Sequence, residues 1–235
     1  MNGDEFRSGT LLHGLCLAAC GLIVGLYVGL AKSRKGSLRR HSLQKFTGIG
    51  CLLAWFLNTA YWAMPSRFMW EQALPLHYCN MANLIGAVAV LWRRRLFQGV
   101  IYFWALALCI WAFITPTVRY GPAHMDFWIF WIYHLFILLA VAHVMVIDQF
   151  RPSFRDLLRV SAFTSLYTIM LVIVDYAFGW NYGFVGPSKP KSPTLIDSLG
   201  VYPLRLVWIT LLAALLFVLA FLPWHWRARK IRPSG

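Results

Sequence analysis

The chain has 235 residues, of which 60% are hydrophobic and only 13% are charged, and its mean hydropathy is +0.61. A soluble domain carries about a quarter charged residues, so this composition excludes an ordinary soluble protein and indicates an integral membrane protein. The formal net charge is +14. Because the basic residues are dispersed among short loops, we expect no nucleic-acid partner.

Seven apolar runs are long enough to cross a bilayer, which takes about 20 helical residues. In chain order the expected spans are residues 11–31, 46–64, 76–92, 97–115, 127–147, 160–178 and 204–222. The sequence therefore predicts an all-α bundle of seven transmembrane helices, which forms a single domain over residues 1–235.

Basic residues predict the orientation of this bundle. Most of the 22 Lys and Arg residues lie in four segments, at 32–45, 93–95, 151–159 and 227–232. The positive-inside rule places these segments in the cytoplasm, so the C-terminus is expected there and the N-terminus outside. We expect the basic loops to contact anionic lipid headgroups of the cell membrane.

The first expected span carries Gly21, Gly25 and Gly29 at a four-residue spacing. Such a stripe allows a neighbouring helix backbone to approach closely. Dimerisation and packing inside the bundle both explain the stripe, and we favour packing inside the bundle because bundles of many helices need such faces. The five cysteines lie inside expected spans without a CxxC pair, so we expect no disulfide framework, metal site or other cofactor.

The connection over residues 179–203, "GWNYGFVGPSKPKSPTLIDSLGVYP", is long for a membrane bundle. Its Gly and Pro residues prevent a continuous helix. Its aromatic and apolar residues argue against disorder, and long loops of this kind are often functional. We expect an ordered cap, re-entrant or not, over the outer mouth of the bundle.

Polar side chains gather at the outer ends of the expected spans, although polar groups are costly in lipid. The run "ALPLHYCNMANLIG" over residues 73–86 contains His77, Cys79, Asn80 and Asn83. His134 lies about 10 Å into its span at a rise of 1.5 Å per residue. Asp175 ends a helical stripe that also contains Ser161, Ser165 and Thr168. This clustering at one depth predicts a polar site in the outer half of the bundle.

Cys79 has two interpretations, because free cysteines are often small buried residues without chemistry. A nucleophilic cysteine needs a neighbouring base. His77 points to a different helix face, whereas His134 reaches Cys79 if the third and fifth spans are neighbours. Asn83 shares the Cys79 face and could orient a substrate carbonyl or the base. Asn80, Asn83 or a loop N–H could stabilise an oxyanion.

The other polar residues also have structural interpretations. His134 could simply hydrogen-bond across helices. Asp175 could pair with His134 or with a basic group of the 179–203 loop, or it could reach the headgroup region. His124, just before the fifth span, stays an open question.

The 179–203 loop resembles the signature of the YwaF-like bacterial integral membrane proteins. The matching residues are Asn181, Tyr182, Lys189, Pro190, Leu195, Asp197, Leu199, Gly200 and Pro203. The runs "LPLHYC" and "FWIFWIYH" are also similar, so the resemblance covers about residues 45–222. That family is similar to a eukaryotic transmembrane cysteine acyltransferase of ether lysophospholipids. It is more distantly similar to androgen-induced membrane hydrolases, which act on fatty-acid esters through a threonine and a histidine.

The resemblance implies that Cys79 is the nucleophile and His134 the general base of a lipid acyltransferase or esterase. It implies supporting roles for Asn181, Tyr182 and Asp197, membrane phospholipid as the partner, and the bacterial plasma membrane as the location. Two other functions stay open. The polar pocket could bind a small ligand for transport or sensing, or the chain could be a scaffold that uses its Gly stripe and basic loops. The oligomeric state is also open.

Overall fold

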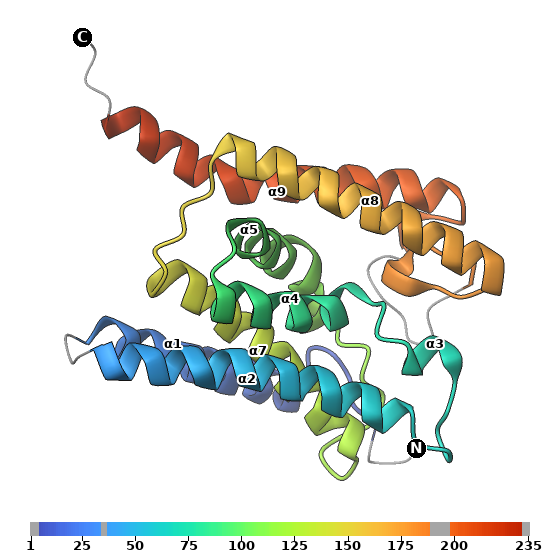
Figure 1. Ribbon diagram of the computed structural model, residues 1–235. Coiled ribbons are helices and arrows are strands. Elements are labelled where there is room, and N and C mark those ends of the chain that lie inside the picture. Colours follow the sequence, from blue (N-terminus) through green and yellow to red (C-terminus); the bar gives the residue numbers. More distant parts are fainter. Residues whose placement is uncertain (1–4, 34–36, 189–197, 232–235) are drawn as a thin grey trace.

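The computed structural model describes residues 5–33, 37–188 and 198–231 (Figure 1). Within these ranges the chain is helical, apart from an isolated bridge between Glu5 and Tyr120. The prediction of an all-α fold is therefore confirmed.

Eleven helical elements follow one another in the described ranges. They are α1 (Leu11–Lys32), α2 (Ser37–Trp62), α3 (Trp70–Ala73), α4 (Tyr78–Trp92), α5 (Arg95–Phe103), the π-helix η1 (Trp104–Cys109), α6 (Trp111–Ile114), α7 (Met125–Val146), α8 (Phe154–Phe178), the 3-10 turn η2 (Tyr182–Phe184) and α9 (Leu204–Ile231). Several helices extend beyond the apolar runs. The α8 helix begins at Phe154 because the Ser153 side chain caps it and Asp156 completes a capping box.

Six helical segments of the described chain are long and apolar enough to cross a membrane. They are Leu11–Lys32, Trp70–Trp92, Arg95–Ile114, Met125–Val146, Phe154–Phe178 and Leu204–Arg227. The α2 helix has 26 residues, but polar residues such as Lys45 and Asn58 lower its mean hydropathy. The chain is therefore a helical, multi-pass membrane protein, whereas the count of seven spans stays a prediction.

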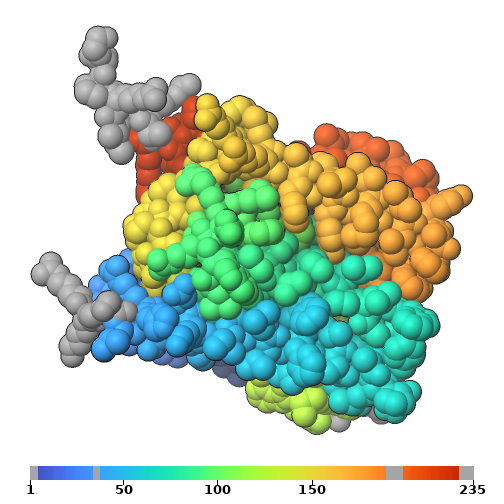
Figure 2. All heavy atoms as spheres, viewed as in Figure 1, coloured from blue at the N-terminus to red at the C-terminus, as the bar shows by residue number. Residues whose placement is uncertain are grey.

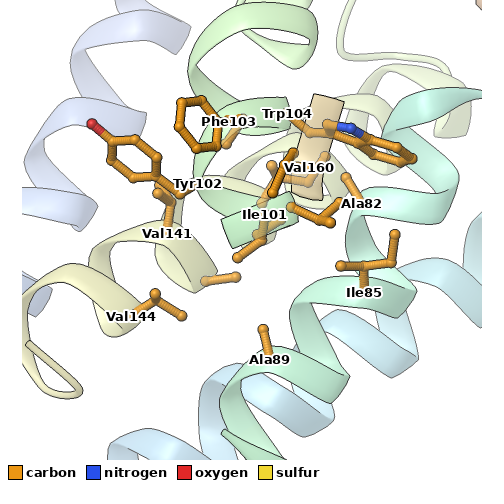
Figure 3. Close-up of a cluster of buried hydrophobic side chains, with 14 of the residues drawn as sticks. Ala82, Ile85, Ala89, Ile101, Tyr102, Phe103, Trp104, Val141, Val144 and Val160 are labelled. Atoms are coloured by element: carbon orange, nitrogen blue, oxygen red, sulfur yellow. The ribbon is translucent and has the colours of Figure 1, made fainter. Parts of the chain in front are cut away.

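The α4 helix lies at the centre of the bundle, between α2 and α7 on one side and α5 on the other (Figure 1). It carries the small residues Ala82, Ala87 and Ala89, all fully buried, and small residues let helices approach closely. In Figure 3 Ala89 lies near Ile101 of α5 and Val144 of α7. The α8 and α9 helices cover the side of this core that lies away from α1 and α2.

The described residues of the four basic segments lie at one end of the bundle, at the left of Figure 1, and those of the long loop lie at the other end. Ion pairs join the segment at 93–95 to the start of α8 and to the residues that follow α7. The Arg95 side chain donates two hydrogen bonds to the Asp156 carboxylate, with nitrogen–oxygen distances of 2.6 and 2.9 Å. Arg93 Nε lies 2.9 Å from Asp148 Oδ1. In the space-filling view the green surface of α4 and α5 lies between the blue surface of the N-terminal helices and the yellow-to-orange surface of α8 (Figure 2).

The expected packing role of the Gly stripe on α1 is wrong. A Cβ atom added at Gly21, Gly25 or Gly29 would meet nothing within 4 Å, so this face is open. The α1 helix instead packs through the face that carries Cys20 and Tyr27. Sequence spacing reveals a small-residue face but not the face that a neighbour occupies.

Candidate functional site

A cavity of about 1170 Å³ lies inside the bundle, between α4 and α7 on one side and α8 and α9 on the other. This volume slightly exceeds the usual range for ligand pockets in proteins, about 300–1,000 Å³. Its polar residues come mainly from α2, α3, α4, α8 and the loop after α8. Its apolar residues come mainly from η1, α6 and α9, and include Leu108, Leu212, Leu216 and Phe217.

Cys79 lines this cavity from the first turn of α4. His77 is the N-cap residue of the helix, with φ −61° and ψ 146°, so the helix starts directly before the cysteine. The first turn of a helix carries partial positive charge, which favours a thiolate. The thiol lies within interaction range of two side chains, the His134 ring and the Cys109 thiol.

His134 is held in one orientation by the main chain of its own helix. The ring is 4% exposed, and its Nδ1 lies 2.7 Å from the Phe130 carbonyl oxygen. A carbonyl can only accept, so Nδ1 carries the hydrogen and the neutral ring keeps a lone pair on Nε2. Nε2 is therefore the nitrogen that can take a proton from Cys79. The α4 and α7 helices are neighbours, as this pairing requires.

Cys109 is the second thiol at the site and was not predicted. It ends the π-helix η1 and is 1% exposed. A π-turn adds a residue to the helical turn and occurs frequently at functional sites. The sequence "WALALC" is as apolar as an ordinary buried helix, so no signal in it marks either the π-turn or the contact with Cys79.

Tyr133 is a further hydroxyl-bearing residue of the cavity wall. It is buried, lines the cavity and interacts with both Cys79 and Cys109. Its hydroxyl makes no hydrogen bond with any other described residue, so the O–H group is available to a bound molecule. In the run "FWIFWIYH" this tyrosine is indistinguishable from apolar aromatic packing.

Asn80 and Asn58 form a polar pair on the cavity wall. Asn58 Nδ2 donates to Asn80 Oδ1 over 3.0 Å, and both residues line the cavity. Because the oxygen of Asn80 is the accepting atom, its amide nitrogen stays available as a donor. Asn58 comes from α2 and was not among the predicted site residues.

Asn83 connects α4 to α7 beside the site but does not line the cavity. Its Nδ2 donates to the Tyr133 carbonyl at 3.0 Å and to the Cys79 carbonyl at 3.4 Å. The amide therefore holds together the two main-chain segments that carry Cys79 and His134. It is placed to position these residues rather than to touch a substrate.

The first part of the long loop, residues 179–188, covers one side of the cavity. The Asn181 N–H donates to Glu71 Oε1 at 3.1 Å, and the Gly186 N–H donates to Asn181 Oδ1 at 3.0 Å. The Gly183 N–H donates to His77 Nδ1 at 3.3 Å. These hydrogen bonds hold the segment against the cavity wall, which includes His77, Glu71 and Asn181. Glu71 was not predicted.

Asp175 and Tyr182 anchor the loop outside the cavity. Asp175 is fully buried and accepts the Tyr182 N–H at 2.9 Å. In the described chain it pairs with neither His134 nor a basic side chain, and its burial keeps it away from headgroups. The Tyr182 hydroxyl donates to the Trp70 carbonyl at 3.4 Å, and burial raises its pKa above the usual value.

The remaining predicted residues lie in different places. His124 is the residue before the first turn of α7, where its side chain makes no capping hydrogen bond. Its ring stacks on Tyr120 with the ring centroids 4.5 Å apart, and it does not line the cavity. Asp197 lies outside the described residues. Ser161, Ser165 and Thr168 line the cavity along one side of α8. Among the described residues no group of three or more His, Cys, Asp or Glu side chains could hold a metal ion.

No curated protein and no solved structure matches the chain. The model of the TMEM164 family matches residues 8–221, which include every described residue of the cavity wall. This match spans nearly the whole chain and all six apolar helical segments in large part. The chain therefore belongs to the TMEM164 family of transmembrane proteins.

Proposed function

We propose that this protein is a membrane-embedded acyltransferase or esterase that acts on lipid esters through Cys79 and His134. One observation carries the proposal: Cys79 and a histidine of fixed orientation interact on the wall of a large cavity in a membrane bundle. This is the arrangement of a nucleophile and its base. The resemblance to YwaF-like proteins, and to the cysteine acyltransferase similar to them, supports the same assignment.

The proposed reaction has two halves. In the first, the Cys79 thiol gives its proton to His134 Nε2 and the sulfur attacks the ester carbonyl carbon. The carbon–oxygen bond of the ester then breaks, and the leaving alcohol takes the proton from His134, which leaves an acyl thioester on Cys79. In the second half, a lysolipid hydroxyl or water gives its proton to Nε2 and attacks the thioester. The sulfur leaves and recovers the proton.

Two donors are available for the negative oxygen of the tetrahedral intermediates. The Tyr133 hydroxyl and the Asn80 amide nitrogen both face the cavity and are not engaged as donors in the described chain. Pre-placed donors of this kind supply a large share of the rate enhancement in acyl transfer. The Cys109 S–H can also donate to the Cys79 sulfur while the sulfur is charged.

We further propose that α2 is a seventh span, with the N-terminus outside and the C-terminus in the cytoplasm of a bacterial plasma membrane. The gathering of the four basic segments at one end of the bundle supports this orientation. The same end would contact anionic headgroups. The cavity and the 179–188 segment then lie toward the outer leaflet, where the ester groups of phospholipids lie.

Ligand binding without catalysis is the second candidate. At its outer end the cavity carries charges of both signs, from Arg119, Glu71 and Asp126, which suits a polar solute. An acyl-transfer assay separates the two candidates, because a binding protein needs neither the thiol nor the base.

The test uses purified protein in lipid nanodiscs with a diacyl phospholipid and a lysophospholipid, and measures acyl exchange by lipid mass spectrometry. We expect the rate of acyl exchange to fall by about 10²–10⁴-fold in Cys79→Ala and in His134→Ala, because a positioned acid–base group contributes a rate factor of this size. The matched control is Cys16→Ala, because Cys16 lies on α1 outside the cavity. Exchange that persists at the wild-type rate in both site variants would end the proposal.

A further inference from the structure

The exposed residues of the cavity wall fall into two separate groups. The first group lies at the outer end of the bundle and consists of Met69, Thr117, Arg119, Tyr120, Gly179 and Ser198. The second group lies along α8 and α9 and consists of Ser165, Ile169, Thr210 and Ala214. A wall residue that is also exposed marks a place where a cavity meets its surroundings. The cavity therefore reaches the protein surface in two places.

The second group lies at the depth of the lipid chains. Ser165 is close to the middle of α8, which runs from Phe154 to Phe178. Thr210 and Ala214 lie about 9 and 15 Å into α9 at a rise of 1.5 Å per residue. The hydrocarbon core of a bilayer is about 30 Å thick, so lipid chains rather than water lie outside this opening.

The helices at this opening expose much of their surface, and three of the four exposed wall residues there are small. The most apolar stretches of α8 and α9 are only 17% and 11% buried, so these two helices leave much of their surface free of protein contacts. Ser165, Thr210 and Ala214 carry short side chains, whereas the adjacent lipid-facing positions are large, such as Leu166 at 70% and Leu215 at 55% exposure. The short side chains leave room between the helices.

The wall behind this opening is apolar. From α9 it contains Leu212, Leu216 and Phe217, and from η1 it contains Leu108. Burying hydrocarbon against such a wall is favourable, whereas a polar solute would lose its hydration there. The outer opening, with Arg119 and Tyr120, has the opposite character. The two openings therefore suit different molecules.

We propose that Ser165, Ile169, Thr210 and Ala214 form a lateral portal through which the hydrocarbon chain of a bilayer lipid enters the cavity that contains Cys79. The portal would give a lipid ester a route from the membrane to Cys79, and in this role it rests on the proposed function. A hydrocarbon chain can enter the cavity without catalysis, so the portal can be tested by measuring how fast reagents label the Cys79 thiol.

The experiment measures how fast two thiol reagents reach Cys79 in lipid nanodiscs. One is a maleimide with a long alkyl chain, which dissolves in the bilayer, and the other is a small, permanently charged thiosulfonate. Peptide mass spectrometry reports labelling at Cys79 and, as an internal reference, at the half-buried Cys16 of α1. We expect Ala214→Trp to slow alkyl labelling of Cys79 by about tenfold or more, because the indole fills the opening. Labelling by the charged reagent should stay unchanged.

Leu215→Trp is the matched control, since Leu215 neighbours Ala214 but faces lipid and does not line the cavity. Ser165→Phe closes the portal from α8 and should repeat the effect of Ala214→Trp. Alkyl labelling of Cys79 that is equal in Ala214→Trp and Leu215→Trp would overturn the portal. Equal slowing of both reagents would also overturn it, because the cavity would then have a single entrance.

The result of the labelling experiment does not depend on the result of the acyl-transfer test. Portal-dependent labelling in a protein without acyl exchange would keep the portal and remove the enzyme. Acyl exchange with portal-independent labelling would keep the enzyme and remove the portal.

Discussion

Gly50 marks a close approach of α2 to α7, and its replacement by alanine tests this packing. The added Cβ atom would lie 2.5 Å from Cζ and 2.7 Å from Cδ1 of Phe136, with Cε1 closer still. Non-bonded carbon atoms need about 3.5–4.0 Å, so the ring must retreat by about 1 Å or more. Phe136 packs on Phe46 with the ring centroids 5.7 Å apart. Overpacking of this kind costs about 1–3 kcal/mol.

The assay is reversible unfolding in detergent micelles, which gives the unfolding free energy of each variant. Gly25→Ala is the control, because its Cβ meets nothing and alanine favours a helix by up to about 1 kcal/mol at either position. Gly50→Ala should therefore be less stable than Gly25→Ala by about 1–3 kcal/mol, and adding Phe136→Leu should recover part of the loss through a favourable coupling energy. A Gly50→Ala variant as stable as Gly25→Ala would refute the packing of α2 on α7.

Three further predictions concern single side chains. Tyr133→Phe removes a hydroxyl without a partner among the described residues, so the unfolding temperature should hold while kcat for acyl transfer falls by about 10²-fold; an unchanged kcat would exclude Tyr133 as a donor. Cys109→Ala should slow maleimide labelling of Cys79, whereas equal rates would mean that the second thiol does not activate the first. Burial raises the pKa of Asp148 above the usual value, although Arg93 opposes the shift. An acid with a raised pKa in the folded state binds its proton more tightly there, so the wild type should lose stability relative to Asp148→Asn as the pH rises from about 4 to 7, and parallel unfolding profiles would contradict this.

Hydropathy predicted the helices because lipid exposure requires continuous apolar surface, but it could not predict their ends. The α8 helix starts ahead of its apolar run because Ser153 and Asp156 cap it. Hydropathy also could not show which face of α1 is occupied, so the Gly21 stripe was assigned to packing that does not exist. The face toward a neighbour depends on tertiary packing, which no single helix encodes.

Cys79 and His134 were predicted to lie at the same depth on two neighbouring spans, and both line the cavity on the adjacent helices α4 and α7. Their roles as nucleophile and base stay a prediction. The contributions of Cys109 and Tyr133 could not be predicted, because they depend on a π-turn and on the direction of one aromatic ring. Asn83 was predicted to be near the site, but its hydrogen bond to the Tyr133 carbonyl makes it a positioning residue. Helix spacing indicates the face of a residue, not its partner.

Trapping the acyl group on the protein tests the proposed chemistry most directly. Wild-type protein in nanodiscs is mixed with a diacyl phospholipid, quenched in acid within a single turnover, and digested for peptide mass spectrometry. We predict an acyl group on Cys79 that hydroxylamine removes, far less of it in His134→Ala, and none in Cys79→Ala. Acyl exchange that proceeds without an acyl group on Cys79, or with the group on another side chain, would contradict the assignment of Cys79 as the nucleophile.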